Sequence, residues 1–247
     1  MSNIISASDY GVYSNRKLSE IVSNNFRTAE VFEKYGLDFC CRGNRSIREA
    51  CEENNIDYKN IVNELNEIRH SSSMERFNEW KLDFLVDYII NNHHEYIHKM
   101  IPVISAHANK VSEAHGLKHP EVTEISKIFF VIYKDLKQHM LKEEQILFPY
   151  IKMLFTLKES GSKSEAPYFG TIKNPIHHME IEHESAGEGF SSIREISNNY
   201  QLPNDACQTL IVFYRELQEF ENDLHKHIHL ENNILFPKSI ALEEEML

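Results

Sequence analysis

Two stretches of the chain repeat the same spacing of histidine and glutamate. DLKQHMLKEEQILFP starts at residue 135 and DLHKHIHLENNILFP starts at residue 223, and they share Asp, Leu, His, Glu, Ile, Leu, Phe and Pro at matched positions. In each stretch the glutamate is at i+4 from the histidine, so on a helix both side chains project from one face. Imidazole and carboxylate together are donors that iron and manganese accept in helical proteins, whereas thiolates would indicate zinc or an iron–sulfur cluster. The repeated residues are His139, Glu143, His227 and Glu231.

These residues lie on the buried faces of two of four predicted helices. Within each of four long segments, core positions recur three and four residues apart, which predicts amphipathic helices with one buried stripe each. The stripes are apolar except for histidine and glutamate, and burying those side chains is costly unless a partner compensates for them. The stripes begin at Ile90, Ile125, Ile176 and Leu210.

Four helices of this kind predict an all-α fold, an up-down-up-down four-helix bundle. The stripes of the first and third helices contain His94 and His183. From His94 to the loop near Gly116 the helix rises roughly 33 Å, and the return to the level of His139 is roughly 30 Å. His94 and His139 therefore arrive at a similar level in the bundle.

Four imidazoles and two carboxylates suit two metal ions, because carboxylates are able to bridge. We predict a non-haem centre of two iron ions bridged by Glu143 and Glu231, in which each iron takes two of the four histidines. The predicted metal ligands are His94, His139, Glu143, His183, His227 and Glu231.

Other residues near the stripes offer alternatives. A single histidine on an apolar stripe is usually a core residue whose hydrogen bonds are satisfied. Six histidine and glutamate residues on four otherwise apolar stripes favour metal binding instead. His98 is the main rival ligand, because it lies one helical turn after His94. Glu182 lies beside His183 on the inward side and is a candidate for the lining of an access path. His115 lies on a stripe about 30 Å from the centre, which favours a structural position or one near an entrance. We expect four residues off the stripes to face solvent: His93, His225, His229 and Glu144.

The residues before the bundle predict a small helical domain. Only one of the 14 histidines precedes Trp80, so the composition changes near this point. LSEIVSNNFRTAEVFEKYG predicts helical structure that ends at Gly36, and Ser46 with Glu49 forms a capping box before the next helix. A third helix is expected over 58–69. The predicted organisation is a small helical N-terminal domain over 1–70, a linker over 71–78 and the bundle over 79–247.

Cys40 and Cys41 are adjacent in the turn-like stretch LDFCCRGNRS. Neighbouring cysteines cannot join distant segments, so the chain is no disulfide scaffold. Arg42 and the helix N-terminus that follows would lower a thiol pKa, which suits a redox role or contact with a partner's cluster. The alternative is that one cysteine packs in the small domain and the other is incidental. Cys51 is expected in the core, and Cys207 receives no assignment.

The composition argues against several classes of protein. The 247 residues include 26 basic and 38 acidic side chains, and the formal net charge of −12 makes nucleic acid a poor partner. Hydrophobic residues make up 41% of the chain, as in globular proteins. No apolar run approaches the roughly 18 residues of a membrane span, and the first residues do not resemble a secretory signal. We therefore expect a cytoplasmic protein that does not bind membranes.

Taken together, these motifs resemble the repair of iron centres family, which consists of di-iron proteins with a double-cysteine N-terminal domain and a hemerythrin-like domain. DFCCRG resembles the short N-terminal domain of that family, and NHHEYIHKMIP, QHMLKEEQILFP, EIEHESAG and DLHKHIHLENNILFP resemble its four ligand-bearing helices. Matched residue by residue, the ligands of the family fall on the six stripe residues predicted above. Oxygen-carrying hemerythrins place a His-x-x-x-His pair on the third helix, whereas here Gly187 follows His183.

The resemblance implies repair of iron–sulfur clusters damaged by nitrosative or oxidative stress. The di-iron centre would donate iron and bind nitric oxide, with nitric oxide reductase-like activity as a further expectation. The implied partners are damaged iron–sulfur proteins, nitric oxide, oxygen and a second copy of the chain. Two alternatives stay open: a hemerythrin-like binder or sensor of oxygen or nitric oxide, and an interaction module in which the metal is only structural.

Overall fold

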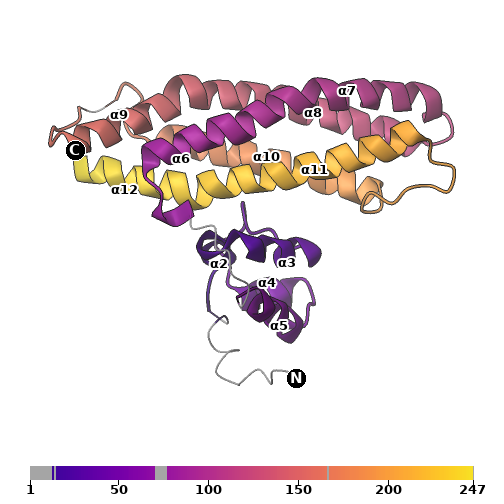
Figure 1. Ribbon diagram of the computed structural model, residues 1–247, viewed down its shortest axis with the longest axis horizontal. Coiled ribbons are helices and arrows are strands. Elements are labelled where there is room, and N and C mark those ends of the chain that lie inside the picture. The colour runs from indigo at the N-terminus through magenta and orange to yellow at the C-terminus, as the bar shows by residue number, and fades with distance from the viewer. Residues whose placement is uncertain (1–12, 14, 70–76, 166, 247) are drawn as a thin grey trace. The chain divides into compact units, whose positions relative to one another are not determined.

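The computed structural model describes residues 13, 15–69, 77–165 and 167–246 of the chain. The chain forms two compact units. The first consists of residues 1–81 together with the segment 228–237, and the second consists of 82–227 with 238–247. Both units are helical, as the sequence predicts (Figure 1).

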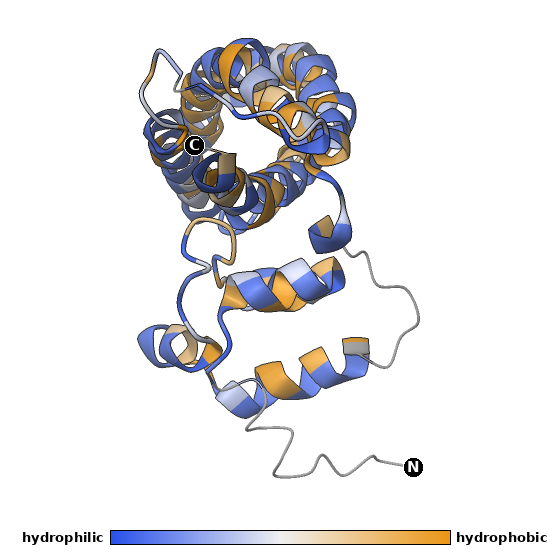
Figure 2. Cartoon of the chain, turned by 90° about the vertical axis from the view of Figure 1, so that its left-hand side faces the viewer, coloured by the Kyte–Doolittle hydropathy of each residue, from blue (hydrophilic) through white to orange (hydrophobic). Residues whose placement is uncertain are grey.

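Four long rods of helix run side by side and form the predicted bundle (Figure 1). Viewed from one end, the rods surround a common interior, toward which many of the hydrophobic residues lie (Figure 2). The first rod is α6 (Leu82–Tyr88), η3 (Ile89–His94) and α7 (Glu95–His115), the second is α8 (Pro120–Lys142), η4 (Glu143–Leu147) and α9 (Phe148–Glu159), the third is α10 (Lys173–Ile196), and the fourth is α11 (Gln208–Leu230), η5 (Glu231–Leu235) and α12 (Phe236–Met246).

A single π-helical turn interrupts the first, second and fourth rods, at η3, η4 and η5. In η4 the N–H of Phe148 donates to the carbonyl of Glu143, and in η5 the N–H of Phe236 donates to the carbonyl of Glu231, so each bond spans five residues instead of four. The next residue in both rods is proline, which has no N–H to donate into the preceding turn. The repeated Phe-Pro pair therefore marks the place where the helix widens, and such turns are frequent at functional sites.

The π turn of the second rod shifts the buried stripe by one residue. In the second rod the regular spacing predicts Ile146 and Met153 in the core, but both are exposed and Leu147 and Leu154 are buried instead. The prediction for those two positions is wrong because the π turn adds one residue to the helical register.

The first unit contains short helices around a small apolar core. Its elements are α2 (Leu18–Asn24), η1 (Phe26–Thr28), α3 (Ala29–Lys34), α4 (Ile47–Glu53), α5 (Tyr58–Arg69) and η2 (Phe77–Glu79). Gly36 ends α3 with a φ of 67°, and the predicted capping box of Ser46 and Glu49 is present at α4. Asn25 adopts an extended conformation and accepts a hydrogen bond from the N–H of Arg27, which divides the predicted first helix into α2 and α3.

The segment 228–237 belongs to this first unit through specific contacts. The side-chain amide of Asn233 lies 3.3 Å from the carbonyl oxygens of both Phe39 and Cys40. The predicted boundaries at 70 and 78 stay predictions, because residues 70–76 lie outside the described part of the chain. None of the described helices combines the length and the apolar character that a membrane crossing requires.

Candidate metal centre

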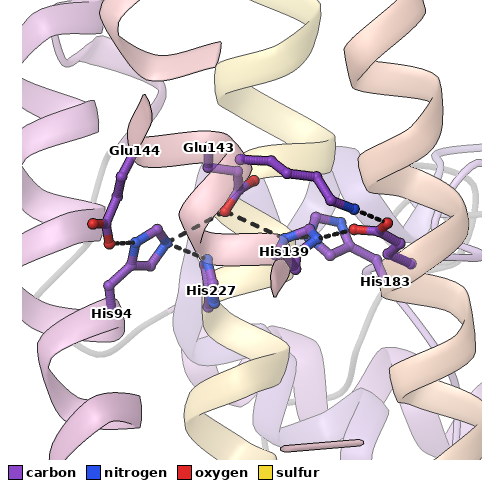
Figure 3. Close-up of polar contacts among 8 residues, drawn as sticks. His94, His139, Glu143, Glu144, His183 and His227 are labelled. Atoms are coloured by element: carbon purple, nitrogen blue, oxygen red, sulfur yellow. Dashed lines mark hydrogen bonds and ion pairs between the residues drawn. The ribbon is translucent and has the colours of Figure 1, made fainter. Parts of the chain in front are cut away.

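All six predicted metal ligands are buried at the middle of the bundle. Each exposes at most 1% of its surface. Figure 3 shows the side chains of five of them, contributed by all four rods, pointing toward one another. Burial of two carboxylates and four imidazoles in an apolar core is costly without a compensating charge. The residues are His94, His139, Glu143, His183, His227 and Glu231.

The six residues form two groups that share both glutamates. One group is His94, Glu143, His227 and Glu231, and the other is His139, Glu143, His183 and Glu231; within each, one ligand atom per residue lies within 4.8 Å of the others. Oε2 of Glu143 lies 3.4 Å from Nε2 of His94 and 3.2 Å from Nε2 of His139. The sharing of two carboxylates between two histidine pairs is the arrangement that a binuclear site requires.

The donor atoms fit a pair of metal ions. Nε2 of His94 lies 3.2 Å from Nε2 of His227, and Nε2 of His183 lies 2.9 Å from Nε2 of His139. In each pair the two ring nitrogens point at the same volume, as they would when both bind one cation. Two nitrogens and two carboxylates per ion suit iron or manganese and leave positions of an octahedral ion open.

In two of these histidines, the second ring nitrogen, Nδ1, contacts a carboxylate that belongs to neither group. Nδ1 of His94 lies 2.7 Å from Oε1 of Glu144, and Nδ1 of His139 lies 2.9 Å from Oε2 of Glu182 (Figure 3). The hydrogen bond from His139 and the ammonium of Lys142 lower the pKa of Glu182 to about 2. An acceptor at Nδ1 fixes the tautomer that directs Nε2 at the centre. The position of Glu144 off the stripe predicts that it faces solvent. Its carboxylate instead contacts Nδ1 of His94.

Comparison with known proteins identifies the family. Residues 85–239 match the Hemerythrin HHE cation binding domain, and residues 14–69 match a domain described as Domain of Unknown function (DUF542). A Haemophilus influenzae protein named "Probable iron-sulfur cluster repair protein" is 34% identical over 229 residues, which cover 92% of this chain and 97% of that protein. The chain belongs to the iron–sulfur cluster repair family. The Escherichia coli protein named "Iron-sulfur cluster repair protein YtfE" is 32% identical over 231 residues, covering 94% of this chain and 99% of that relative.

Two histidines that were expected to face solvent in this family member are buried. His93 exposes 2% of its surface, its Nδ1 lies 3.0 Å from Oδ1 of Asp223, and its ring stacks on that of His227 with an interplanar angle of 4°. His229 is fully buried in the first unit, with its ring 5.8 Å from the rings of Phe26 and Phe39. The solvent prediction is wrong for both, because faces beside the central stripe are also covered. His225 is partly buried.

The remaining candidates lie outside the two groups. His98, the rival ligand, is exposed. Nε2 of His115 lies 2.9 Å from Sγ of Cys207. Glu182 lines a cavity of about 490 Å³ beside His139, together with apolar and small residues of α8 and α10. The lining includes Ile128, Val131, Leu136, Ala186 and Gly189.

The cysteine pair of the DUF542 domain has surroundings that differ from the prediction. Cys40 is buried, Cys41 is partly exposed, and their Sγ atoms are 4.0 Å apart. The hydrogen bond to Cys41, burial and the neighbouring Asp38 carboxylate raise the pKa of the Cys40 thiol well above its usual value. The expectation of a lowered thiol pKa is therefore wrong for Cys40, because the hydrogen bond to Cys41, burial and the carboxylate of Asp38 all disfavour the thiolate. Asp38 was missed, although an aspartate two residues before a cysteine is a signal for a side-chain-to-backbone turn.

Proposed function

We propose that this chain is a di-iron protein that repairs iron–sulfur clusters damaged by nitrosative or oxidative stress, chiefly by donating iron. The observation that carries the proposal is the pair of buried histidine and glutamate groups with Glu143 and Glu231 in common. The names of the relatives, which span nearly the whole chain, supply the biological context.

In this proposal each iron has two histidine ligands, and the glutamates bridge. His94 and His227 serve one iron, and His139 and His183 serve the other, as the two groups of neighbouring side chains indicate. The irons, when bound, supply open coordination positions for small diatomic molecules and a source of iron for a damaged cluster. Iron rather than zinc is proposed because two nitrogens and two carboxylates per ion, with octahedral positions left open, suit iron, and because the relatives are named as iron–sulfur cluster repair proteins.

The protein groups around the centre have separate tasks. Glu144 and Glu182 accept the Nδ1 protons of two ligand rings and thereby orient them. The fully buried side chains of the two groups exclude bulk water. We propose that the cavity beside His139 is the route by which nitric oxide or oxygen approaches, since its lining is largely apolar.

The partners and the wider chemistry belong to the same proposal. The protein would act in the cytoplasm on damaged iron–sulfur proteins, with nitric oxide reductase-like activity at the centre and a homodimer as a predicted assembly. A reversible oxygen or nitric oxide binder or sensor is the alternative function. Gly187, where oxygen-carrying hemerythrins have a second histidine on the third helix, favours repair over oxygen transport.

Metal analysis followed by iron transfer tests the proposal. Protein purified anaerobically after iron-replete expression is expected to hold about two irons per chain, since the six side chains form two groups that share both glutamates. Incubation with an apo iron–sulfur protein and sulfide should then restore its cluster, and Glu143→Ala protein should restore less. One tightly bound zinc without iron would contradict the metal assignment. Two irons that never leave the protein, with reversible oxygen binding, would support the alternative function instead.

A further inference from the structure

A second cluster of metal-binding side-chain types lies in the first unit. One carboxylate oxygen of Asp38 and the Sγ atoms of Cys40 and Cys41 all lie within 4.8 Å of one another. Oδ1 of Asp38 is 3.2 Å from Sγ of Cys40, and the two sulfurs are 4.0 Å apart. Adjacent side chains in an extended chain point to opposite faces, so their convergence here depends on the turn.

Several hydrogen bonds fix that turn. Oδ1 of Asp38 accepts the backbone N–H of both Cys40 and Cys41, at 2.9 Å each. Asn233 donates its amide to the carbonyls of Phe39 and Cys40, at 3.3 Å each. Gly43 completes the turn, because a Cβ at this position would lie 2.1 Å from the carbonyl oxygen of Phe39. The sulfurs therefore converge before any ligand binds.

The separation of the sulfurs fits a tetrahedral ion. Metal–sulfur bonds of about 2.3 Å at a tetrahedral angle place two thiolates about 3.8 Å apart. The observed 4.0 Å between Sγ of Cys40 and Sγ of Cys41 requires only a small adjustment. A disulfide would require about 2.05 Å between the same atoms and a specific dihedral angle, which is a much larger rearrangement.

We propose that Asp38, Cys40 and Cys41 bind one thiophilic divalent cation, zinc or ferrous iron, in a site separate from the bundle centre. Two S–H bonds break and two metal–sulfur bonds form, and the two protons pass to solvent. The metal formally keeps its oxidation state, so no oxidant or reductant is required. Three protein ligands leave one tetrahedral position open, and the partial exposure of Asp38 and Cys41 leaves that position accessible.

Cation binding at this site depends on pH. The cation displaces the proton of each thiol, so binding weakens as the pH falls. The proposal does not depend on the identity of the ions in the bundle, since none of these three residues belongs to the histidine and glutamate groups.

Cobalt binding to the full chain provides a direct test. The protein is first loaded with iron at the bundle centre, its thiols are kept reduced by a phosphine, and Co²⁺ is added without oxygen. A thiolate-to-cobalt charge-transfer band should appear and reach its limit at one equivalent per chain, and Zn²⁺ should remove it. Histidine and carboxylate ligands do not give this band, so cobalt that enters the bundle centre is not mistaken for the new site.

Variants decide which thiols bind. Cys41→Ser, at a partly exposed position, should abolish the band, and Asp38→Asn should weaken cobalt binding by 10-fold or more. Cys207→Ser is the matched control, because that cysteine contacts His115 and should leave the band unchanged. Thermal unfolding of each variant checks that it folds. The absence of a band in the unaltered chain, or a band that survives Cys41→Ser or is lost in Cys207→Ser, would overturn the proposal whether or not the bundle holds iron.

Discussion

Nδ1 of His94 lies 2.7 Å from a carboxylate oxygen of Glu144, a residue of the neighbouring rod. Glu144 directly follows Glu143, so consecutive residues of η4 contact the same ring from two sides: Glu143 faces Nε2 and Glu144 faces Nδ1. The π turn thus carries both a shared glutamate and the acceptor that orients a histidine of another rod. Glu144 and Glu182 thus form an outer layer of carboxylates around the candidate ligands, and substitutions in this layer test its effect on the centre.

Replacing Glu144 should weaken the metal centre without unfolding the bundle. Glu144→Ala removes the acceptor at Nδ1 of His94, and the loss of such a partner typically lowers metal affinity by about 10- to 100-fold. Competition with an iron chelator measures the effect. Glu144→Gln keeps an acceptor oxygen and should retain part of the affinity. Glu184→Ala, at an exposed position of α10, is the control and should match the unaltered chain.

Removing one shared glutamate should separate the two metals. Glu143→Ala deletes a donor that both groups have in common, so we expect one iron per chain or two that are no longer magnetically coupled. The apolar stripes should keep the helices folded. Iron analysis and Mössbauer or magnetic measurements provide the readout. His178→Ala, which alters an exposed histidine, serves as the control. Two coupled irons in Glu143→Ala protein, with loss of iron in the control, would mean that the ligand assignment is wrong.

His93→Ala would be an unsuitable control for that comparison. His93 is buried with its ring stacked on that of His227, and it contacts Asp223. Replacing it by alanine would therefore disturb His227, one of the candidate ligands. The same observation explains why the sequence misplaced His93. A stripe analysis assigns one buried face to each helix, whereas a helix in a bundle also has flanks that face its neighbours.

Much of the bundle and all six central residues were predictable, because the strict three-and-four spacing reports one helical face. The spacing fails after Glu143, where Leu147 replaces Ile146 in the core. Periodicity assumes a constant number of residues per turn, and a π turn breaks that assumption locally. The Phe-Pro pair that follows each shared glutamate was visible in the sequence, but a proline alone does not specify a π turn.

The roles of Glu144, Asp38 and Glu182 depend on contacts between separate elements. Glu182 of α10 contacts His139 of α8, and this contact exists only because the two helices pack against each other. Asp38 acts on Cys40 through a local turn whose geometry also involves Asn233, far along the chain. A single sequence provides no direct record of contacts between distant residues, so the contacts of Glu144, Glu182 and Asn233 could not be predicted, whereas the spacing of Asp38 and Cys40 was a signal of the local turn.

The bundle should keep its metal when the N-terminal residues are removed. A chain beginning near Ser73 retains all six candidate ligands, so about two irons should remain. Its unfolding temperature should fall, because His229 and Asn233 lose their contacts with Phe26, Phe39 and Cys40. Iron analysis and thermal unfolding measure the two effects separately. Loss of iron in a folded truncated chain would show that the removed N-terminal residues are needed to hold the centre.

The last prediction concerns Glu243, a buried carboxylate of α12 that joins three elements of the bundle. It accepts hydrogen bonds from the hydroxyl of Tyr150 at 2.8 Å, the hydroxyl of Thr171 at 2.5 Å and the N–H of Ile172 at 2.9 Å. Glu243→Ala leaves these donors without their acceptor and should reduce the free energy of unfolding by about 3 kcal/mol, measured with urea at pH 8. Burial and Glu243 raise the pKa of Tyr150 to about 12, so the pKa of Tyr150 in the variant should fall toward 10.

Glu244→Ala is the control for this prediction. It removes only an exposed ion pair with Lys173 and should reduce the free energy of unfolding by less than about 1 kcal/mol. Equal effects of the two substitutions would contradict the structural role of Glu243.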